Sequence, residues 1–167
     1  MHAIELATTR VVTMRPEDSL QHGAQLMQKH LVGCVVVARP DASGSIPLGV
    51  LTDRDLCRIG LTGDAEIENI AVEAVMSRPL VVCPQEATLA QIVGIMRGSG
   101  LRRLPVVERQ GHLVGIISAN DVIVAITQLL QQLTEVLVVE PALRDHLVAL
   151  EYTRDTSEDA AMGGGAS

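Results

Sequence analysis

The sequence predicts an α/β fold of the mixed α+β kind, in which two βαββα units pack as a pseudo-two-fold pair. The first observation is a repeat: the stretch Gly49–Asp55 (GVLTDRD) recurs 66 residues later as Gly115–Asp121 (GIISAND). The second is that the same order of apolar and turn-forming segments precedes each copy. The third is a hydrophobic fraction of 47% in 167 residues, which is enough for a sizeable core.

The first copy supplies each element of one unit in turn. Residues 11–14 are a short β-branched run, and Ser19 can cap the helix that follows. Gly33 can turn the chain after this helix. Residues 34–38 form a continuous apolar run, typical of a strand buried on both faces. After an expected loop at 40–45, residues 46–51 form the next strand, and Thr52 begins a short helix that runs to about Gly60.

The second copy repeats this order. Strands are expected at 80–83, 104–107 and 113–117, a helix from Leu89 to near Gly98, and a further helix after Ser118. The turn at 108–111 leaves the adjacent His112 as an expected exposed loop residue. Between the copies, apolar residues within 64–76 predict one more helix.

A helical extension is expected after the second copy. The helix from about 119 to 139 carries apolar residues at heptad spacing, namely Val122, Ile126, Leu129, Leu133 and Val136. Core packing and a partner helix explain this spacing equally well. Pro141 can open a last helix over 142–152, and the glycine-rich end is typical of a disordered tail. The expected divisions are therefore 1–66, 67–128, 129–152 and 153–167.

Composition excludes several classes of function. The net charge of −7 disfavours nucleic acid as a partner, since such binding relies on neutralised phosphates. The single aromatic residue, Tyr152, leaves no platform for stacking bases. No apolar run approaches the roughly 18 residues that span a bilayer. Residues 1–10 lack the apolar core of a signal peptide. We therefore expect a cytoplasmic protein without a membrane partner.

Catalytic and metal-binding patterns are missing from the sequence. Cys34, Cys57 and Cys83 form an odd, widely spaced set without a CxxC motif, which favours reduced thiols. The five histidines are scattered, and none pairs at ligand spacing. No nucleophile–histidine–acid set or glycine-rich phosphate loop stands out. We expect neither an enzyme nor a metal site.

The repeated motif has two explanations. A hydroxyl residue followed three positions later by an acid is a capping box, which satisfies the free N–H groups at a helix start. The same helix start also suits a phosphate, and an ionised Asp offers two acceptor oxygens that match the two hydroxyls of a ribose. The motif occurs twice, each time after a glycine-led apolar strand, and this pairing raises the binding explanation to equal weight.

Both copies resemble the cystathionine-β-synthase (CBS) domain, and the chain is similar to a stand-alone CBS pair, or Bateman module. The resemblance runs over residues 3–127. It is carried in the second copy by 75–79, 101–107, 111–118 and Asp121, and in the first by 12–13, 16–20, Met27, 29–30, Gly33 and 49–56. The first copy departs from the family pattern at 34–36, where Cys-Val-Val replaces a basic residue and Leu-Pro.

This resemblance implies a ligand-sensing module without chemistry or cofactor of its own. CBS pairs commonly bind adenosine-containing ligands such as AMP, ADP, ATP, S-adenosylmethionine or NAD-type dinucleotides, and associate through their helices into dimers. The implied first pocket consists of Val50, Thr52, Asp55, Leu80, Val81, Leu101, Arg103 and Pro105. The implied second pocket consists of Thr9, Val11, Val32, Ile116, Ser118 and Asp121. The alternative is a structural or interaction protein with no small-molecule ligand.

The two implied pockets differ in charge. Arg54 and the pair Arg102-Arg103 accompany the first, whereas Ala119, Asn120 and Cys34 occupy the matching places in the second. Since Arg suits phosphate recognition, we expect the Asp55 pocket to bind phosphate more tightly.

Overall fold

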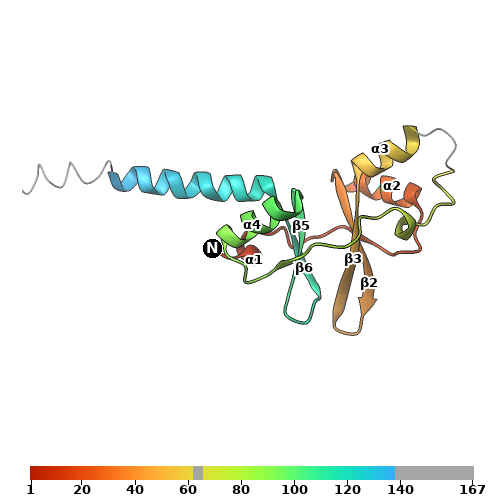
Figure 1. Cartoon of the computed structure of the whole chain (residues 1–167), viewed down its shortest axis with the longest axis horizontal. Coiled ribbons are helices and arrows are strands. Elements are labelled where there is room, and N and C mark those ends of the chain that lie inside the picture. Colours follow the sequence, from red (N-terminus) through yellow and green to blue (C-terminus); the bar gives the residue numbers. More distant parts are fainter. Residues whose placement is uncertain (62–65, 138–167) are drawn as a thin grey trace, which may run out of the picture. The chain divides into compact units, whose positions relative to one another are not determined.

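The computed structural model describes residues 1–61 and 66–137, and these residues form two three-stranded sheets (Figure 1). The first sheet contains β1 (Thr13–Met14), β2 (Cys34–Asp41) and β3 (Gly44–Thr52), with helices α2 (Leu20–His30) and α3 (Asp53–Leu61). The second contains β4 (Cys83–Pro84), β5 (Arg103–Val107) and β6 (Leu113–Ser118), with α4 (Leu89–Ser99) and a helix over residues 119–137. In each sheet the first strand is parallel and the third antiparallel to the middle strand. The predicted pair of βαββα units is confirmed.

The helices begin and end where local chemistry satisfies the backbone. The Ser19 side chain accepts a hydrogen bond from the His22 N–H at 3.2 Å, which confirms it as the cap of α2. The helix ends at Leu31, whose φ of 54° is left-handed, so the prediction that Gly33 makes this turn is wrong. In the second unit Thr88 caps α4 and Gly100, with φ of 69°, ends it.

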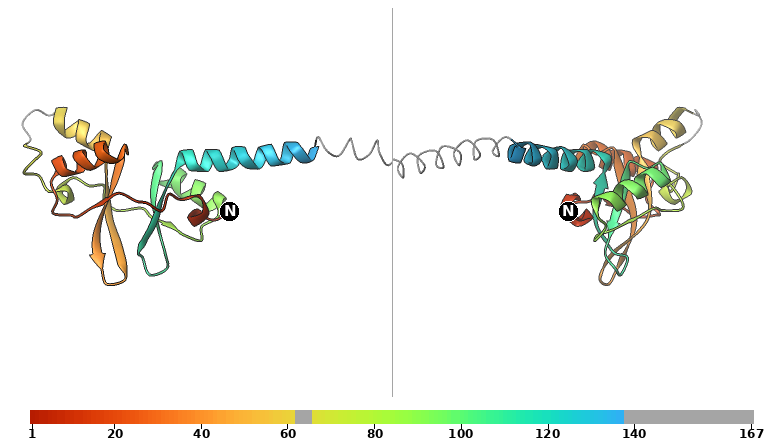
Figure 2. Two further views of the ribbon diagram at one scale, coloured as in Figure 1. Left: turned by 180° about the vertical axis from the view of Figure 1, so that it is seen from behind. Right: turned by 60° about the vertical axis from the view of Figure 1, so that its left-hand side comes forward.

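The loop predicted at residues 40–45 is wrong, because most of it is strand. β2 and β3 pair in register as far as Pro40 with Ser45 and Asp41 with Gly44, so only residues 42 and 43 remain as a turn. This long hairpin lies beside the β5–β6 hairpin, and β3 contacts β6 (Figure 2). The side-by-side arrangement brings the two units together along their third strands.

The helix predicted within residues 64–76 is also wrong for the described part of that segment. Residues 66–76 contain only the three-residue 3₁₀ turn Val72–Ala74. The backbone of this segment instead satisfies the start of α2: the carbonyl groups of Ile67 and Ile70 accept from Gln21 and Leu20. Because these groups bond to another element, they are not available for a helix of their own.

Each hydrophobic core takes a segment from outside its own unit. The first core, around Leu20 and Leu51, includes Val72 and Met76 from the connection between the units. The second core, around Leu104 and Ile117, includes Ala3 from the unpredicted short helix α1 (Ala3–Leu6). The N-terminal residues therefore pack on the second unit, and residues 67–76 pack on the first.

By compactness the chain divides into two parts: residues 1–123, which hold both βαββα units, and a C-terminal part that begins at Val124. Along the described helix, Val122 is buried, but the next heptad positions are exposed: Ile126, Leu129, Leu133 and Val136. The predicted last helix and tail lie outside the described residues. In residues 1–61 and 66–137 no helix combines the length and apolar character needed to cross a membrane.

Candidate ligand-binding site

The two repeated motifs form capping boxes of nearly identical geometry. In the first, the Thr52 hydroxyl and N–H donate to Asp55 Oδ2 at 2.6 and 2.9 Å, and the Asp55 N–H donates back to Thr52 Oγ1 at 3.3 Å. The Ser118–Asp121 pair gives 2.7, 2.7 and 3.3 Å for the same three bonds. The capping explanation therefore holds at both junctions, and both side chains are held in place.

Capping leaves part of each carboxylate unused. The two bonds that each carboxylate accepts both go to Oδ2, and within the described residues no hydrogen bond reaches Oδ1 of Asp55 or Asp121. An ionised carboxylate can accept several hydrogen bonds. Each junction therefore offers a fixed acceptor oxygen to a hydroxyl-bearing ligand without losing its cap.

The first junction opens into a cavity of about 250 Å³ that brings together segments from both units. Its lining combines the end of β3 and the start of α3 with most residues of the segments 77–81 and 100–105. All eight residues predicted for the first pocket line it. Six further residues line the cavity that the sequence did not assign to the pocket: Asp53, Arg54, Ser77, Pro79, Gly100 and Arg102. Of these, Arg54 and Arg102 had been expected near it.

The second junction opens into a cavity of about 310 Å³. Five of the six predicted residues line it, namely Val11, Val32, Ile116, Ser118 and Asp121. Thr9 does not, whereas its neighbours Thr8 and Arg10 do. Thr8 forms an isolated bridge to Ile116 through two backbone hydrogen bonds of 2.9 and 3.0 Å, so this segment lines the cavity one residue away from the predicted position.

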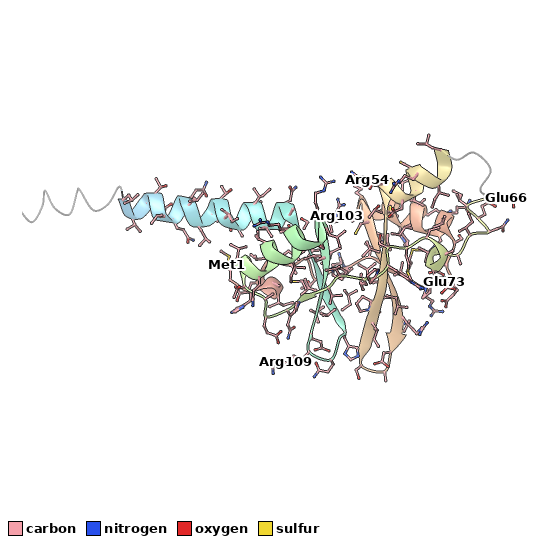
Figure 3. All side chains as sticks on the ribbon, in the orientation of Figure 1. Met1, Arg54, Glu66, Glu73, Arg103 and Arg109 are labelled. Carbon is pink, nitrogen blue, oxygen red and sulfur yellow. The ribbon has the colours of Figure 1, made fainter. Side chains whose placement is uncertain are left out.

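Arginine side chains supply positive charge to both cavities. Arg54, Arg102 and Arg103 line the first, and Arg10 and Arg103 line the second. None of these guanidinium groups makes an ion pair or side-chain hydrogen bond to a described residue. Figure 3 shows Arg54 and Arg103 at the end of the strands opposite the turn that carries Arg109. The expected charge difference between the pockets is thus smaller than the sequence indicated, because Arg10 and Arg103 had not been placed in the second.

The cysteines are free thiols in two environments. Cys34 lines the second cavity, and burial raises the pKa of its thiol, an effect that Arg103 opposes and Asp53 reinforces. Burial likewise raises the pKa of Cys83, while Cys57 is exposed. Across residues 1–61 and 66–137, no three His, Cys, Asp or Glu side chains are grouped so as to hold a metal ion.

The prediction that His112 is an exposed loop residue is wrong. Its side chain is 11% exposed and lies between the hairpins of the two units. Nδ1 lies 2.7 Å from Glu108 Oε1, and Nε2 lies 2.9 Å from Asp41 Oδ2. The hydrogen bonds to Asp41 and then Glu108 raise the pKa of His112, and His112 lowers the pKa of Asp41. No local pattern signals this contact, because Asp41 is 71 residues away in the sequence.

Sequence comparison agrees with the fold. The profile of the CBS domain matches residues 3–61 and 72–128. The CBS domain-containing protein YhcV of Bacillus subtilis is 34% identical over 117 residues, which are 70% of this chain and 79% of that protein. The uncharacterized protein MK0525 of Methanopyrus kandleri is 28% identical over 119 residues, and the match takes in 71% of this chain but only 59% of that protein.

Solved structures show the same architecture. The CBS-domain containing protein ATU1752 from Agrobacterium tumefaciens superposes with a TM-score of 0.63 at 34% identity, over 74% of this chain and 92% of that one. The CBS domain protein PAE2072 from Pyrobaculum aerophilum, crystallised in complex with AMP, gives 0.65 at 21% identity, over 72% and 89%. With the profile matched in both units and the paired repeats present, the chain belongs to the CBS domain family.

Proposed function

We propose that the chain is a non-catalytic sensor module that binds an adenosine-containing ligand between its two CBS repeats and thereby changes its conformation or its partners. One observation carries the proposal: each cavity joins a fixed hydroxyl–Asp pair of one repeat to segments outside that repeat. The arginines in its lining make no ion pair with any residue that the structure describes. Binding there depends on the relative position of the two repeats, which is what a sensor requires.

The chemistry of the first cavity fits the parts of a nucleotide. The start of α3 carries partial positive charge that favours a phosphate, and Arg54, Arg102 and Arg103 add charged donors. Asp55 suits the ribose hydroxyls. The apolar wall, which suits an adenine ring in a cavity without aromatic residues, consists of Val50, Leu80, Val81, Leu101 and Pro105.

The AMP complex of PAE2072 supports AMP as the first ligand to test. At 21% identity that structure supports the fold rather than the site, so ADP, ATP, S-adenosylmethionine and NAD stay in the set. We propose that the first cavity is the tighter phosphate site, since three arginines line it and two line the second.

Titration of AMP into variants tests the site directly. Asp55→Ala and Asp121→Ala each remove one carboxylate, and we expect each to weaken binding at its own cavity by about tenfold or more, as for loss of a hydrogen bond to a charged group. The larger loss is expected for Asp55→Ala. Isothermal titration calorimetry measures both. Equal losses would contradict the ranking of the cavities, and unchanged binding in both variants would contradict the site.

These substitutions also remove a helix cap, so a matched control is needed. Thr88 and Gln91 form the same kind of capping box at α4, and neither residue lines the two cavities. Gln91→Ala should lower the unfolding free energy by about 0.5–2 kcal/mol while leaving AMP affinity unchanged. A fall in affinity in this control would show that lost stability, and not the missing carboxylate, weakens binding.

The alternative function is that of an interaction protein without a ligand. The exposed apolar face of the C-terminal helix favours it, and the partner we propose for that face is a second copy of this chain. Residues 122–137 carry a single charged side chain, Glu135, so two copies can approach along this helix without the repulsion expected from a net charge of −7. Absence of thermal stabilisation by all five adenosyl ligands would favour this alternative.

A further inference from the structure

Arg103 is the one residue that lines both cavities in the described part of the chain. It is the first residue of β5 and lies opposite Ser118 of β6, so its backbone stands beside the hydroxyl–Asp pair of the second cavity. Arg103 also lines the first cavity, together with Arg54 and Arg102. Arg103 therefore stands where the two cavities come closest.

The pseudo-two-fold symmetry explains this position. Cys34 lies opposite Thr52 in the first unit just as Arg103 lies opposite Ser118 in the second. Cys34 is short and lines the second cavity only, whereas the long arginine lines both. Of the two matching positions, only position 103 carries a guanidinium group, and the two cavities share it.

Two further observations place the guanidinium between the cavities. A Cβ atom built on Gly33, which lines the second cavity, would lie 3.4 Å from Arg103 Nη2 and 3.0 Å from Asp53 Oδ2. Asp53 lines the first cavity. Burial is the main cause of the raised pKa of Cys34; Arg103 opposes this shift and Asp53 reinforces it, as expected of charges close to the thiol.

We propose that Arg103 couples the two cavities, so that a phosphate-bearing ligand held in one lowers the affinity of the other for the same class of ligand. The inference rests on the proposed function. The guanidinium makes no ion pair with a described residue, so it is available to an incoming phosphate. Once Arg103 is bound to a phosphate in one cavity, the other cavity loses the donors of Arg103 and gains a nearby negative charge.

Such coupling is reciprocal and depends on the phosphate. Whichever cavity fills first must weaken the other by the same factor, and couplings of this kind typically amount to about tenfold. Adenosine has the same base and ribose but no phosphate. It should occupy the two cavities independently, because it has no group that competes for Arg103.

Calorimetric titration of AMP into the full chain and its variants tests this inference. Asp55→Ala weakens the first cavity and Asp121→Ala weakens the second, so in each of these single-site variants the intact cavity fills first and reports its intrinsic affinity. In the unaltered chain the second AMP binds while the first cavity to fill is already occupied. We expect its affinity to be about tenfold lower than that of the same cavity in the single-site variant that keeps this cavity intact. Arg103→Gln should weaken both sites yet abolish the difference between paired and isolated sites.

Arg102→Gln is the matched control, because Arg102 lines the first cavity only. It should weaken that cavity and preserve the coupling. Three results would overturn the inference while leaving the proposed function standing. They are coupling that persists in Arg103→Gln, coupling of positive sign, and two AMP molecules that bind the unaltered chain with the affinities measured in the single-site variants. Failure of AMP to bind either single-site variant or the unaltered chain would overturn both.

Discussion

At the scale of single residues, the glycine that opens each repeated motif has a packing role. A Cβ on Gly115 would lie 2.9 Å from Ala7 Cβ and 3.2 Å from the Thr8 carbonyl oxygen. A Cβ on Gly49 would lie 2.5 Å from Met76 Sδ. In each unit the glycine thus permits a segment from outside that unit to cross the third strand at close range.

Gly115→Ala should lower the free energy of unfolding by about 1–3 kcal/mol, because the backbone carbonyl of Thr8 cannot move away as a flexible side chain can. Urea denaturation followed by circular dichroism measures the change. Gly94→Ala is the control: Gly94 lies within α4, and apart from the adjacent backbone of its own helix no described atom lies within 4 Å of the added Cβ, so this variant should gain about 0.5–1 kcal/mol. A neutral Gly115→Ala would show that the crossing segment is free to shift.

At the scale of elements, the two long hairpins are joined by a titratable contact. His112 from the second unit lies between Asp41 of the β2–β3 hairpin and Glu108 of its own hairpin. The charged groups facing it are these two carboxylates, and Arg109 in the same turn is paired with Glu86 instead. A protonated His112 therefore bridges two negative charges, one from each unit.

The pH dependence of stability should carry this signature. The pKa of His112 is raised in the folded chain, so its stabilisation is complete below the unfolded value near 6.5 and is lost as pH rises through the folded value. The pKa of Asp41 is lowered, so its contribution is present above about 3.8 and is lost as pH falls through the folded value. Urea midpoints of the unaltered chain should fall as pH rises above 6.5.

His112→Gln keeps a polar side chain but cannot titrate, so the fall in midpoint above pH 6.5 should become shallower in this variant. His22→Gln, at an exposed position of α2, should keep the slope of the unaltered chain. If His112→Gln and the unaltered chain show the same slope, the contact between the hairpins makes no pH-dependent contribution to folding.

At the scale of the whole molecule, the exposed apolar face of the C-terminal helix concerns assembly. Apolar residues at successive heptad positions remain exposed in the described part of the helix, together with Leu130 and Leu137 beside them. A stripe of this width is broader than a strict two-position seam and is typical of helices that pack in bundles. Pairing of two copies along it would bury this surface.

Leu129→Glu combined with Leu133→Glu should shift the assembly to a smaller mass in light scattering at micromolar concentration, because each substitution would bury an unpaired charge in the interface. The control is Gln128→Glu with Gln131→Glu, which adds the same charge at neutral polar positions of the same helix. The control should keep the mass of the unaltered chain. An unaltered chain that is already monomeric would contradict self-association through this face.

The sequence by itself determined the local architecture: two βαββα units, their order, the Ser19 cap of α2 and the twin hydroxyl–Asp junctions. These follow from apolar periodicity and from bonds between residues three positions apart, such as Thr52 with Asp55, which need no information about distant parts of the chain. The pocket residues contributed by the other repeat, such as Leu80 and Leu101 in the first pocket, were implied by the resemblance to CBS pairs and not by any local pattern.

Only the tertiary structure decided which residues make contacts between the two units. Three features depend on contacts between residues far apart in the chain. Ala3 and Val72 each pack in the core of the other unit, His112 is buried against Asp41, and Arg103 lines both cavities. A periodic pattern shows which face of an element is buried but not which distant side chain covers it. The shared arginine is visible only once the two repeats are packed together.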